Sequence, residues 1–221
     1  ITEEVQIKFA SHNLWIGGVQ VTDANRNDLS TGNPCVTAGA ISYNSDTKTL
    51  TLDNATISTT GHVNGILSAL NGLKINVVGN NTITASTYSY SAIELSNSTT
   101  ILGGGKLTIN NTTNYACLWT WNPLTIENCT LNTTGGNVAI GSNGSGPLTF
   151  NNATVTVANA STGLIKDFGS ISFNGCSIFS PDGAKVTGGK VTDASGNTVI
   201  TEEVTIKFVS YNLQIAGVQV T

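Results

Sequence analysis

The stretch LTLDNATI at residues 50–57 carries the pattern that decides the fold. Similar phrases recur along the chain: LTIENCTL at 124–131, LTFNNATV at 148–155, ISFNGCSI at 171–178, and shorter copies at 73–75 and 100–102. If Leu52, Ile75, Ile101, Ile126, Phe150 and Phe173 are equivalent, the steps between them are 23, 26, 25, 24 and 23 residues. A repeat of about 24 residues indicates a solenoid of stacked structural units.

Each phrase has the pattern of two short strands joined by a corner. Leu50 and Leu52 alternate with a threonine, as expected for a half-buried strand, and an Asp-Asn pair then interrupts the alternation. The corner position is taken by residue types that readily adopt a left-handed backbone conformation: Asn54, Asn128, Asn152 and Gly175.

A second apolar column predicts a further strand in each coil. It consists of Ile66, Ile93, Leu118, Ile140 and Ile165, at steps of 27, 25, 22 and 25 residues. We therefore expect an all-β fold: a right-handed, single-stranded parallel β-helix of about six coils, between about residues 42 and 185, with irregular or antiparallel terminal caps.

The two ends of the chain repeat each other. Residues 2–22 return as residues 201–221, with 16 of 21 positions identical at an offset of 199. The simplest interpretation is one β-helix module, residues 1–199, followed by the start of a second tandem copy, residues 200–221, so that adjacent modules are partners of one another. The alternative is that both copies are related end caps of one domain.

Composition limits the partners of the chain. The net charge is −4 and Arg26 is the single arginine, so a nucleic-acid groove of clustered basic residues is not expected. No apolar run predicts a membrane span, and the Thr- and Asn-rich surface indicates a secreted or cell-surface location. His12 and His62 are isolated and no Cys-x-x-Cys motif occurs, so neither a metal site nor a cofactor is expected.

The cysteines divide into two pairs. Cys129 and Cys176 occupy the same position of the phrase two coils apart, about 10 Å, which is too far for a disulfide. They are expected to be small core residues. A bridge between Cys35 and Cys117 remains open.

The pattern resembles a family of secreted bacterial β-helix modules that includes carbohydrate-binding-domain and adhesin-like surface proteins. The resemblance rests on NLWIGGVQVT at residues 13–22, VGNNTI at 78–83 and GGGKLTI at 103–109. It implies a surface or secreted protein associated with a polysaccharide or host glycan, and it assigns no binding residue, because the matching residues are strands and turns.

Catalysis on a polysaccharide is not expected. A hydrolase of this architecture requires paired carboxylates, and a lyase requires a base beside acidic calcium ligands. Neither an Asp-Asp pair nor a Gly-His-Gly motif occurs, and Arg26 lies outside the coils.

Two tryptophans form the candidate binding surface. If Leu118 points inward, strand alternation turns Trp119 and Trp121 outward, with Glu94 one coil below and Asn143 one coil above. A sugar stacks its C–H face on aromatic rings while its hydroxyls form hydrogen bonds with such polar groups.

Tyr90 and Tyr115, at a step of 25 residues, complete the candidate glycan site. The alternative is that a loop such as residues 110–114 covers the Trp rings and makes them a small satellite core. The chain would then be a purely structural stalk or spacer of a surface adhesin.

Overall fold

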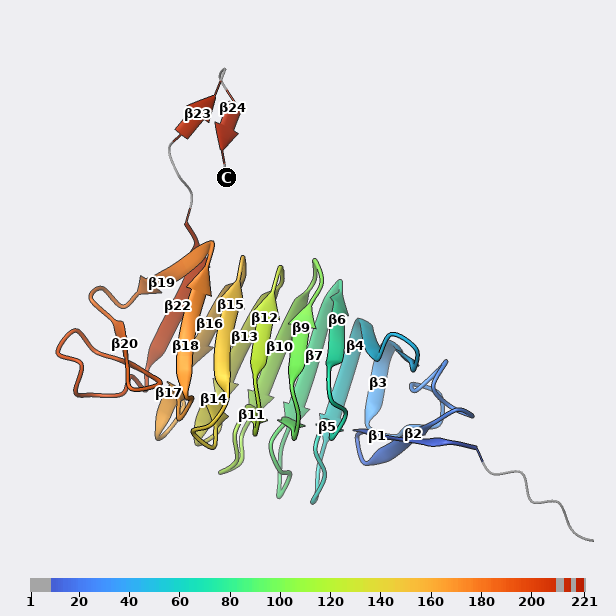
Figure 1. Ribbon diagram of the computed structural model, residues 1–221. Helices are drawn as coiled ribbons and strands as arrows, with labels where there is room; N and C mark the ends of the chain where they lie inside the picture. The colour runs from blue at the N-terminus through green and yellow to red at the C-terminus, as the bar shows by residue number, and fades with distance from the viewer. Residues whose placement is uncertain (1–8, 210–212, 216–217, 221) are drawn as a thin grey trace, which may run out of the picture.

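The computed structural model describes residues 9–209, 213–215 and 218–220. Within these residues every regular element is a β-strand, and the coils stack in parallel as a β-solenoid of about five turns (Figure 1). The expectation of an all-β parallel β-helix is confirmed. A sixth coil begins at β18 (Ser170–Asn174), but an antiparallel strand interrupts it, so the count of six was one too high.

Three faces run along the solenoid. Face 1 contains the parallel strands β5 (Ile66–Ser68), β8 (Ile93–Leu95), β11 (Leu118–Thr120), β14 (Val138–Ser142) and β17 (Gly163–Lys166). Face 2 contains β6 (Leu73–Val78), β9 (Thr99–Leu102), β12 (Leu124–Glu127), β15 (Pro147–Asn151) and β18. Face 3 contains β7 (Asn80–Ala85), β10 (Lys106–Asn111), β13 (Thr130–Gly135) and β16 (Thr154–Ala158).

The first coil differs from the others because one long strand serves two faces. β4 (Thr49–Thr59) pairs with β6 through its first half and with β7 through its second half. Asn54 lies at the bend between the two halves, with a φ of 50°. The continuous strand joins faces 2 and 3 into a single hydrogen-bonded sheet.

The corner between faces 2 and 3 uses the left-handed conformation in every coil, as the sequence predicts. Asn128, Asn152 and Gly175 have φ values of 50°, 44° and 64°. Two glycines, Gly79 and Gly103, take the same corner in the intervening coils, with φ values of 65° and 112°. Asparagine and glycine occur there because other residues are strained at positive φ.

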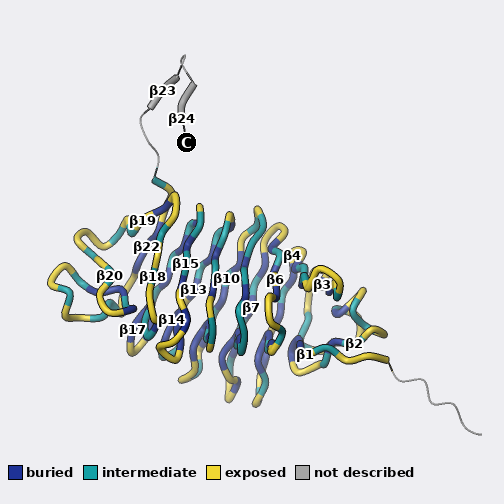
Figure 2. The backbone as a smooth tube through the Cα atoms, viewed as in Figure 1, coloured by how far each residue is buried: buried dark blue, intermediate teal, exposed yellow. Residues whose placement is uncertain are grey.

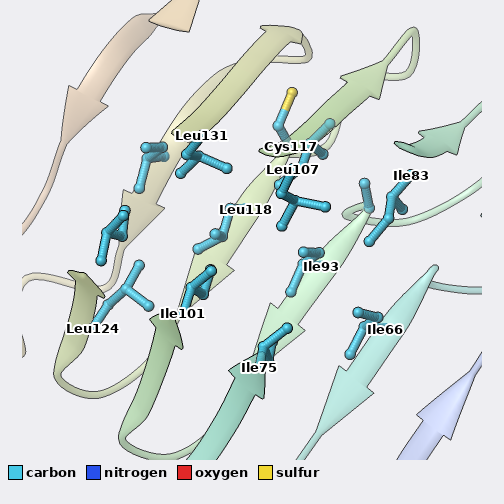
Figure 3. Packing of buried hydrophobic residues seen from close by; sticks show 14 of the residues in the cluster. Ile66, Ile75, Ile83, Ile93, Ile101, Leu107, Cys117, Leu118, Leu124 and Leu131 are labelled. Atoms are coloured by element: carbon cyan, nitrogen blue, oxygen red, sulfur yellow. The ribbon is translucent and has the colours of Figure 1, made fainter. Parts of the chain in front are cut away.

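Buried positions recur along the strands of the three faces (Figure 2), and their apolar side chains form one core cluster. On face 1 the expected column is confirmed, since Leu118 pairs with both Ile93 and Ile140. Figure 3 shows Ile66, Ile93 and Leu118 packed with Ile75 and Ile101 of face 2. Within each strand, successive side chains point alternately into this core and away from it, which explains the period-2 pattern of the sequence.

One register in the face 2 column was wrong by two residues. Ile75 pairs with Leu50, whereas Leu52 pairs with Val77. A shift of two residues keeps the same face inward, so both leucines are buried as expected. From Ile101 onward, Ile126, Phe150 and Phe173 follow the predicted register.

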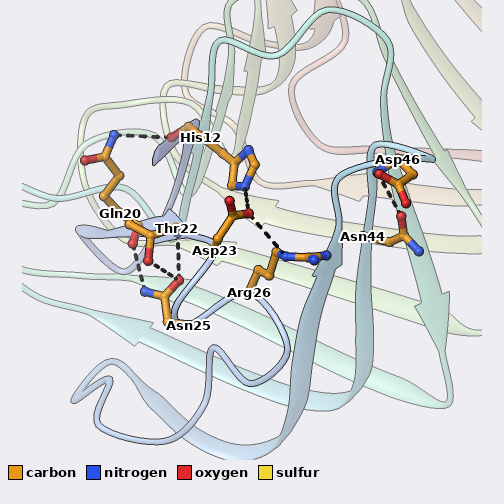
Figure 4. Close-up of polar contacts among 8 residues, drawn as sticks. All are labelled: His12, Gln20, Thr22, Asp23, Asn25, Arg26, Asn44 and Asp46. Carbon is orange, nitrogen blue, oxygen red and sulfur yellow. Dashed lines mark hydrogen bonds and ion pairs between the residues drawn. The ribbon is translucent and has the colours of Figure 1, made fainter. Parts of the chain in front are cut away.

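The N-terminal cap is antiparallel. β1 (Ser11–Ile16) and β2 (Val19–Thr22) form a hairpin, β1 pairs with β5, and β3 (Val36–Asn44) pairs with β4. Polar contacts fix the cap (Figure 4): His12 Nε2 and Arg26 Nε lie 3.1 and 3.3 Å from the same Asp23 oxygen.

The C-terminal cap contains a strand from the repeated phrase. β22 (Glu203–Phe208) lies antiparallel between β16 and β19 (Cys176–Ser180), where a regular coil would stack β19 directly on β16. Two hairpins complete this end of the chain: β20 (Lys185–Thr187) with β21 (Lys190–Thr192), and β23 (Leu213–Ile215) with β24 (Val218–Val220).

All four cysteines are free. Cys129 and Cys176 are buried, and each Sγ lies against a backbone carbonyl of the core, so they are small core residues as expected. Cys35 and Cys117 do not form the bridge that the sequence left open.

Candidate functional site

An outward row of side chains crosses face 1 from the N-terminal cap to the third coil. Trp15 of β1 pairs with Leu67, Leu67 with Glu94, and Glu94 with Trp119. Their alternate neighbours Ile16, Ile66, Ile93 and Leu118 are fully buried. Strand alternation thus places the row on the outer surface of the solenoid.

Trp119 and Trp121 lie side by side on this surface, as predicted. Their rings meet edge to face, with centroids 6.1 Å apart and an interplanar angle of 78°. Trp121 is 43% exposed and Trp119 is half-buried. The alternative of a loop that covers both rings therefore does not hold for Trp121.

A glycine in the next coil provides the space for the Trp119 ring. Gly141 pairs with Trp119 in the β11–β14 ladder. A Cβ atom at Gly141 would lie 3.0 Å from the ring and 2.8 Å from Val138 Cγ1, closer than ordinary van der Waals contact. The absence of a side chain at Gly141 therefore allows the Trp119 ring to pack against this coil.

Glu94 is held between two coils by donors on each side. Trp121 Nε1 donates to Glu94 Oε1 at 3.5 Å, and Asn64 Nδ2 donates to Glu94 Oε2 at 3.3 Å. Asn64 Nδ2 also donates to the Ser91 carbonyl at 2.8 Å, which fixes the amide. The carboxylate keeps unused acceptor positions, because an ionised carboxylate has about four.

A hollow of about 290 Å³ opens beside the tryptophans. It is lined by Ser91, Glu94, Tyr115, Ala116, Trp119, Trp121 and Asn137. Three aromatic rings, one carboxylate and one amide thus converge on one open depression, the composition expected of a sugar subsite.

A second aromatic group adjoins the first at the turn before face 1. The rings of Tyr90 and Tyr115 meet edge to face at 5.3 Å, so the predicted register of these two residues is confirmed. His62 contacts Tyr90 and Tyr88, at centroid distances of 5.6 and 6.2 Å. The sequence predicts an isolated His62, whereas the structure places its ring against these two tyrosines.

A further hollow of about 230 Å³ extends the surface to the N-terminal cap. Trp15, His62, Asn64, Leu67 and Tyr90 are among the residues that line it. We call the six rings Trp15, His62, Tyr90, Tyr115, Trp119 and Trp121 the aromatic strip. In the sequence, the alternation of Trp15 with Leu14 and Ile16 indicates that Trp15 points outward. This alternation does not indicate which strand β1 pairs with.

Asn143 does not line the hollow beside the tryptophans. Its Oδ1 accepts hydrogen bonds from Ser145 Oγ and the Ser145 amide, at 2.6 and 3.3 Å, within its own turn. Ser145 Oγ in turn contacts the Trp121 carbonyl at 3.2 Å. Asn143 therefore supports the turn above Trp121, and Asn137 is the amide that faces the hollow.

Other kinds of site are not seen in the described part of the chain. Within it, no three His, Cys, Asp or Glu side chains gather as a metal site, and no helix is present that could cross a membrane. Comparison with protein-family models, with curated proteins and with solved structures gives no match to this chain.

Proposed function

We propose that this chain is a non-catalytic, secreted or cell-surface module that binds a neutral polysaccharide along the aromatic strip. The observation that carries the proposal is the Trp119–Trp121 pair, with Trp121 exposed and Trp119 half-buried, beside the Glu94 carboxylate in an open hollow. Exposure of large aromatic rings to water is unfavourable in free energy, and a ligand that covers the rings with its apolar C–H faces removes this unfavourable contribution.

The direction of the strip favours a chain-like ligand. Trp15 and Trp119 are separated by three strand spacings, about 14 Å along the solenoid axis. The two hollows lie at either end of this interval, and the contacts of Tyr90 with His62 and Tyr115 connect them. A short oligosaccharide segment of a longer polymer fits this arrangement better than a single sugar.

Charge favours an uncharged glycan. Among the residues that the structure describes, Glu94 is the only charged one that lines the hollow beside the tryptophans, and the whole chain has a net charge of −4. A uronate or sulfated polymer would bring further negative charge close to this carboxylate. Sugar hydroxyls, in contrast, are donors that a carboxylate binds strongly.

The same lining argues against hydrolysis. Glycosidases use two carboxyl groups that flank the scissile bond. The residues lining the hollow include one carboxylate, and its two oxygens are oriented by Trp121 and Asn64. Binding without bond cleavage is the function that these groups support.

Affinity gel electrophoresis with soluble neutral glucans, xylans, mannans and galactans tests the proposal, with a polyuronate as the charged comparison. Because each aromatic contact contributes about 0.5–1.5 kcal/mol, the double variant Trp119→Ala/Trp121→Ala should weaken binding by about tenfold or more. The matched control is Phe179→Ala, which removes a 65% exposed ring outside the strip and should leave binding unchanged. Equal binding by the double variant and the control would refute the proposal.

The stability of the double variant is part of the same test. Exposed rings contribute little to folding, so we expect a loss of less than about 2 kcal/mol in the free energy of unfolding. A loss of several kcal/mol, typical of large-to-small core substitutions, would mean that the rings are structural.

A structural stalk is the second candidate function, and the outer surface of face 2 favours it. Short polar side chains join its last two strands, β15 and β18, with Ser172 Oγ donating to Thr149 Oγ1 at 3.1 Å and Asn174 Nδ2 to Asn151 Oδ1 at 2.6 Å. Such a surface serves a rigid spacer as well as a binding module. Failure of the whole glycan panel with a folded wild-type chain would favour the stalk.

A further inference from the structure

The last complete coil of the solenoid is covered by a strand that comes from the repeated phrase. On one side β22 pairs with β16, with Ile206 opposite Val155 and Val204 opposite Val157. On the other side it pairs with β19, with Ile206 opposite Ile178. Both edges of β22 therefore form antiparallel ladders. The strand lies between β16 and β19 and joins them by hydrogen bonds.

The strand also contributes to the core. Val204 and Ile206 are fully buried members of the central apolar cluster. Thr205 lies between them on the opposite side of the strand and is also buried, whereas Lys207 and Phe208 are exposed. The position between β16 and β19, which we call the cap slot, thus selects a strand with two apolar residues separated by one position.

The beginning of the chain carries a second strand of the same sequence. Residues 2–9 read TEEVQIKF and residues 201–208 read TEEVTIKF, so seven of eight positions are identical. Val5 and Ile7 correspond to Val204 and Ile206. The one difference, Gln6 for Thr205, falls between the two apolar positions and leaves both of them unchanged.

The hairpin that follows each copy is also the same. Leu213 pairs with Val220 and Ile215 with Val218, and β1–β2 has the equivalent Ile16–Val19 pair at the offset of 199. In the first copy this hairpin covers the first coil, because β1 pairs with β5. The repeated phrase therefore has two parts: a strand that closes the coils before it and a hairpin that covers the coils after it.

We propose that residues 2–9 can act as a donor strand that fills the cap slot of a second copy of this chain when β22 of that copy is displaced. The contact is antiparallel β-augmentation between β16 and β19 of that copy. Since β22 closes the coils that precede it, residues 203–208 belong to the same folding unit as those coils. Residue 9 leads toward β1 in the N-terminal cap, whereas the slot lies at the C-terminal end of the solenoid, so the contact is head-to-tail.

A matched pair of variants separates the two copies of the strand. Ile206→Asp places a charge in the core and should lower the Tm of the full chain by roughly 10 °C or more. Ile7→Asp makes the same change in the same phrase and should leave the Tm of the monomer unchanged, because β22 already fills the cap slot of that monomer. Equal effects of the two variants would overturn the inference.

Oligomerisation tests the exchange directly. In the wild-type chain residues 203–208 occupy the cap slot, so the chain should remain monomeric in size-exclusion chromatography with light scattering. Ile206→Asp weakens this strand and leaves residues 2–9 as the better occupant, so concentration-dependent oligomers should form. The double variant Ile206→Asp/Ile7→Asp has no competent strand and should stay monomeric.

If Ile206→Asp does not fold, a peptide experiment tests the occupancy of the cap slot instead. Ile206→Ala removes buried methyl groups without adding charge, and a peptide of residues 2–9 in excess should raise its Tm. The same peptide with Ile7→Asp should not. The proposal would be overturned if the unmodified peptide did not raise the Tm, or if the double variant formed the same oligomers as Ile206→Asp. Neither outcome would bear on glycan binding.

Discussion

The ring of Phe173 lies stacked on the ring of Phe150, with centroids 5.4 Å apart and an interplanar angle of 11°. Phe150 is fully buried, whereas Phe173 is half-buried. The two rings continue the face 2 column that Ile101 and Ile126 form in earlier coils. The column becomes wider where the regular stacking of coils ends, and Phe150 is its last fully buried member.

Phe150 should consequently be a strong contributor to stability. Phe150→Ala removes a complete buried ring and leaves a cavity, so we expect a loss of about 3–5 kcal/mol in the free energy of unfolding, measured by urea denaturation. Phe173→Ala is the internal control and should cost less, because part of its ring is already exposed. A larger loss for Phe173→Ala than for Phe150→Ala would contradict this ranking.

The corner at Asn152 should reject a β-branched residue. Its φ of 44° lies in the left-handed region, where valine is strained, so Asn152→Val should cost about 1–2 kcal/mol. Asn152→Gly is the control and should cost less, since glycine occupies the equivalent corner at Gly79 and Gly103. An unchanged Tm for Asn152→Val would show that another conformation is available at this corner.

Gly141→Ala should disturb the Trp119 ring. The added methyl group would lie within about 3 Å of the ring and of Val138, and overpacking of this kind typically costs about 1–3 kcal/mol. Gly104→Ala is the matched control, because nothing lies within 4 Å of the position where its Cβ would be. Tryptophan emission and thermal unfolding report both effects; identical behaviour of the two variants would argue against the packing of Trp119 on Gly141.

Buried thiols should make the fold sensitive to alkaline pH. Desolvation by burial raises the pKa of Cys117 to about 12 and that of Cys129 to about 11, from an ordinary value near 9. Above pH 9 these thiols ionise in the unfolded chain while they remain protonated in the folded chain. Stability should therefore be constant below pH 9 with respect to these groups and fall as the pH rises toward 11.

The variant Cys117→Ala checks this assignment. Its free energy of unfolding should decline less steeply between pH 9 and 11 than that of the wild-type chain. In native alkylation at pH 8, Cys35 should react first, because it is half-buried while Cys117, Cys129 and Cys176 are buried. Rapid modification of Cys117 in the folded chain would contradict the burial of its thiol.

The sequence predicted the parts of the fold that depend on local alternation. The Ile93–Leu118–Ile140 column is correct because each side chain sits on a short strand of regular pattern. Leu52 was misplaced by two residues because β4 continues through the corner as one strand, and a period-2 pattern does not distinguish registers that differ by two. The insertion of β22 depends on pairing between distant segments, which alternation does not encode.

The candidate site was predicted in part for the same reason. Outward Trp119 and Trp121 and the contact of Tyr90 with Tyr115 followed from strand register. His62 and Trp15 were missed because their positions depend on a turn and on the antiparallel cap. Asn143 was expected beside the rings, but a hydrogen-bonded turn holds its side chain elsewhere.

The capping strand β22 also determines the rate at which the solenoid unfolds from its C-terminal end. An internal coil has a neighbour on each side, whereas a terminal coil has one, so unfolding of a solenoid starts at its ends and proceeds inward. Because β22 binds β16 and β19 along both of its edges, release of the last coil requires both ladders to break. The lifetime of the folded state at this end is therefore set by the six residues of β22, which lie outside the repeating coils, rather than by the contacts between those coils.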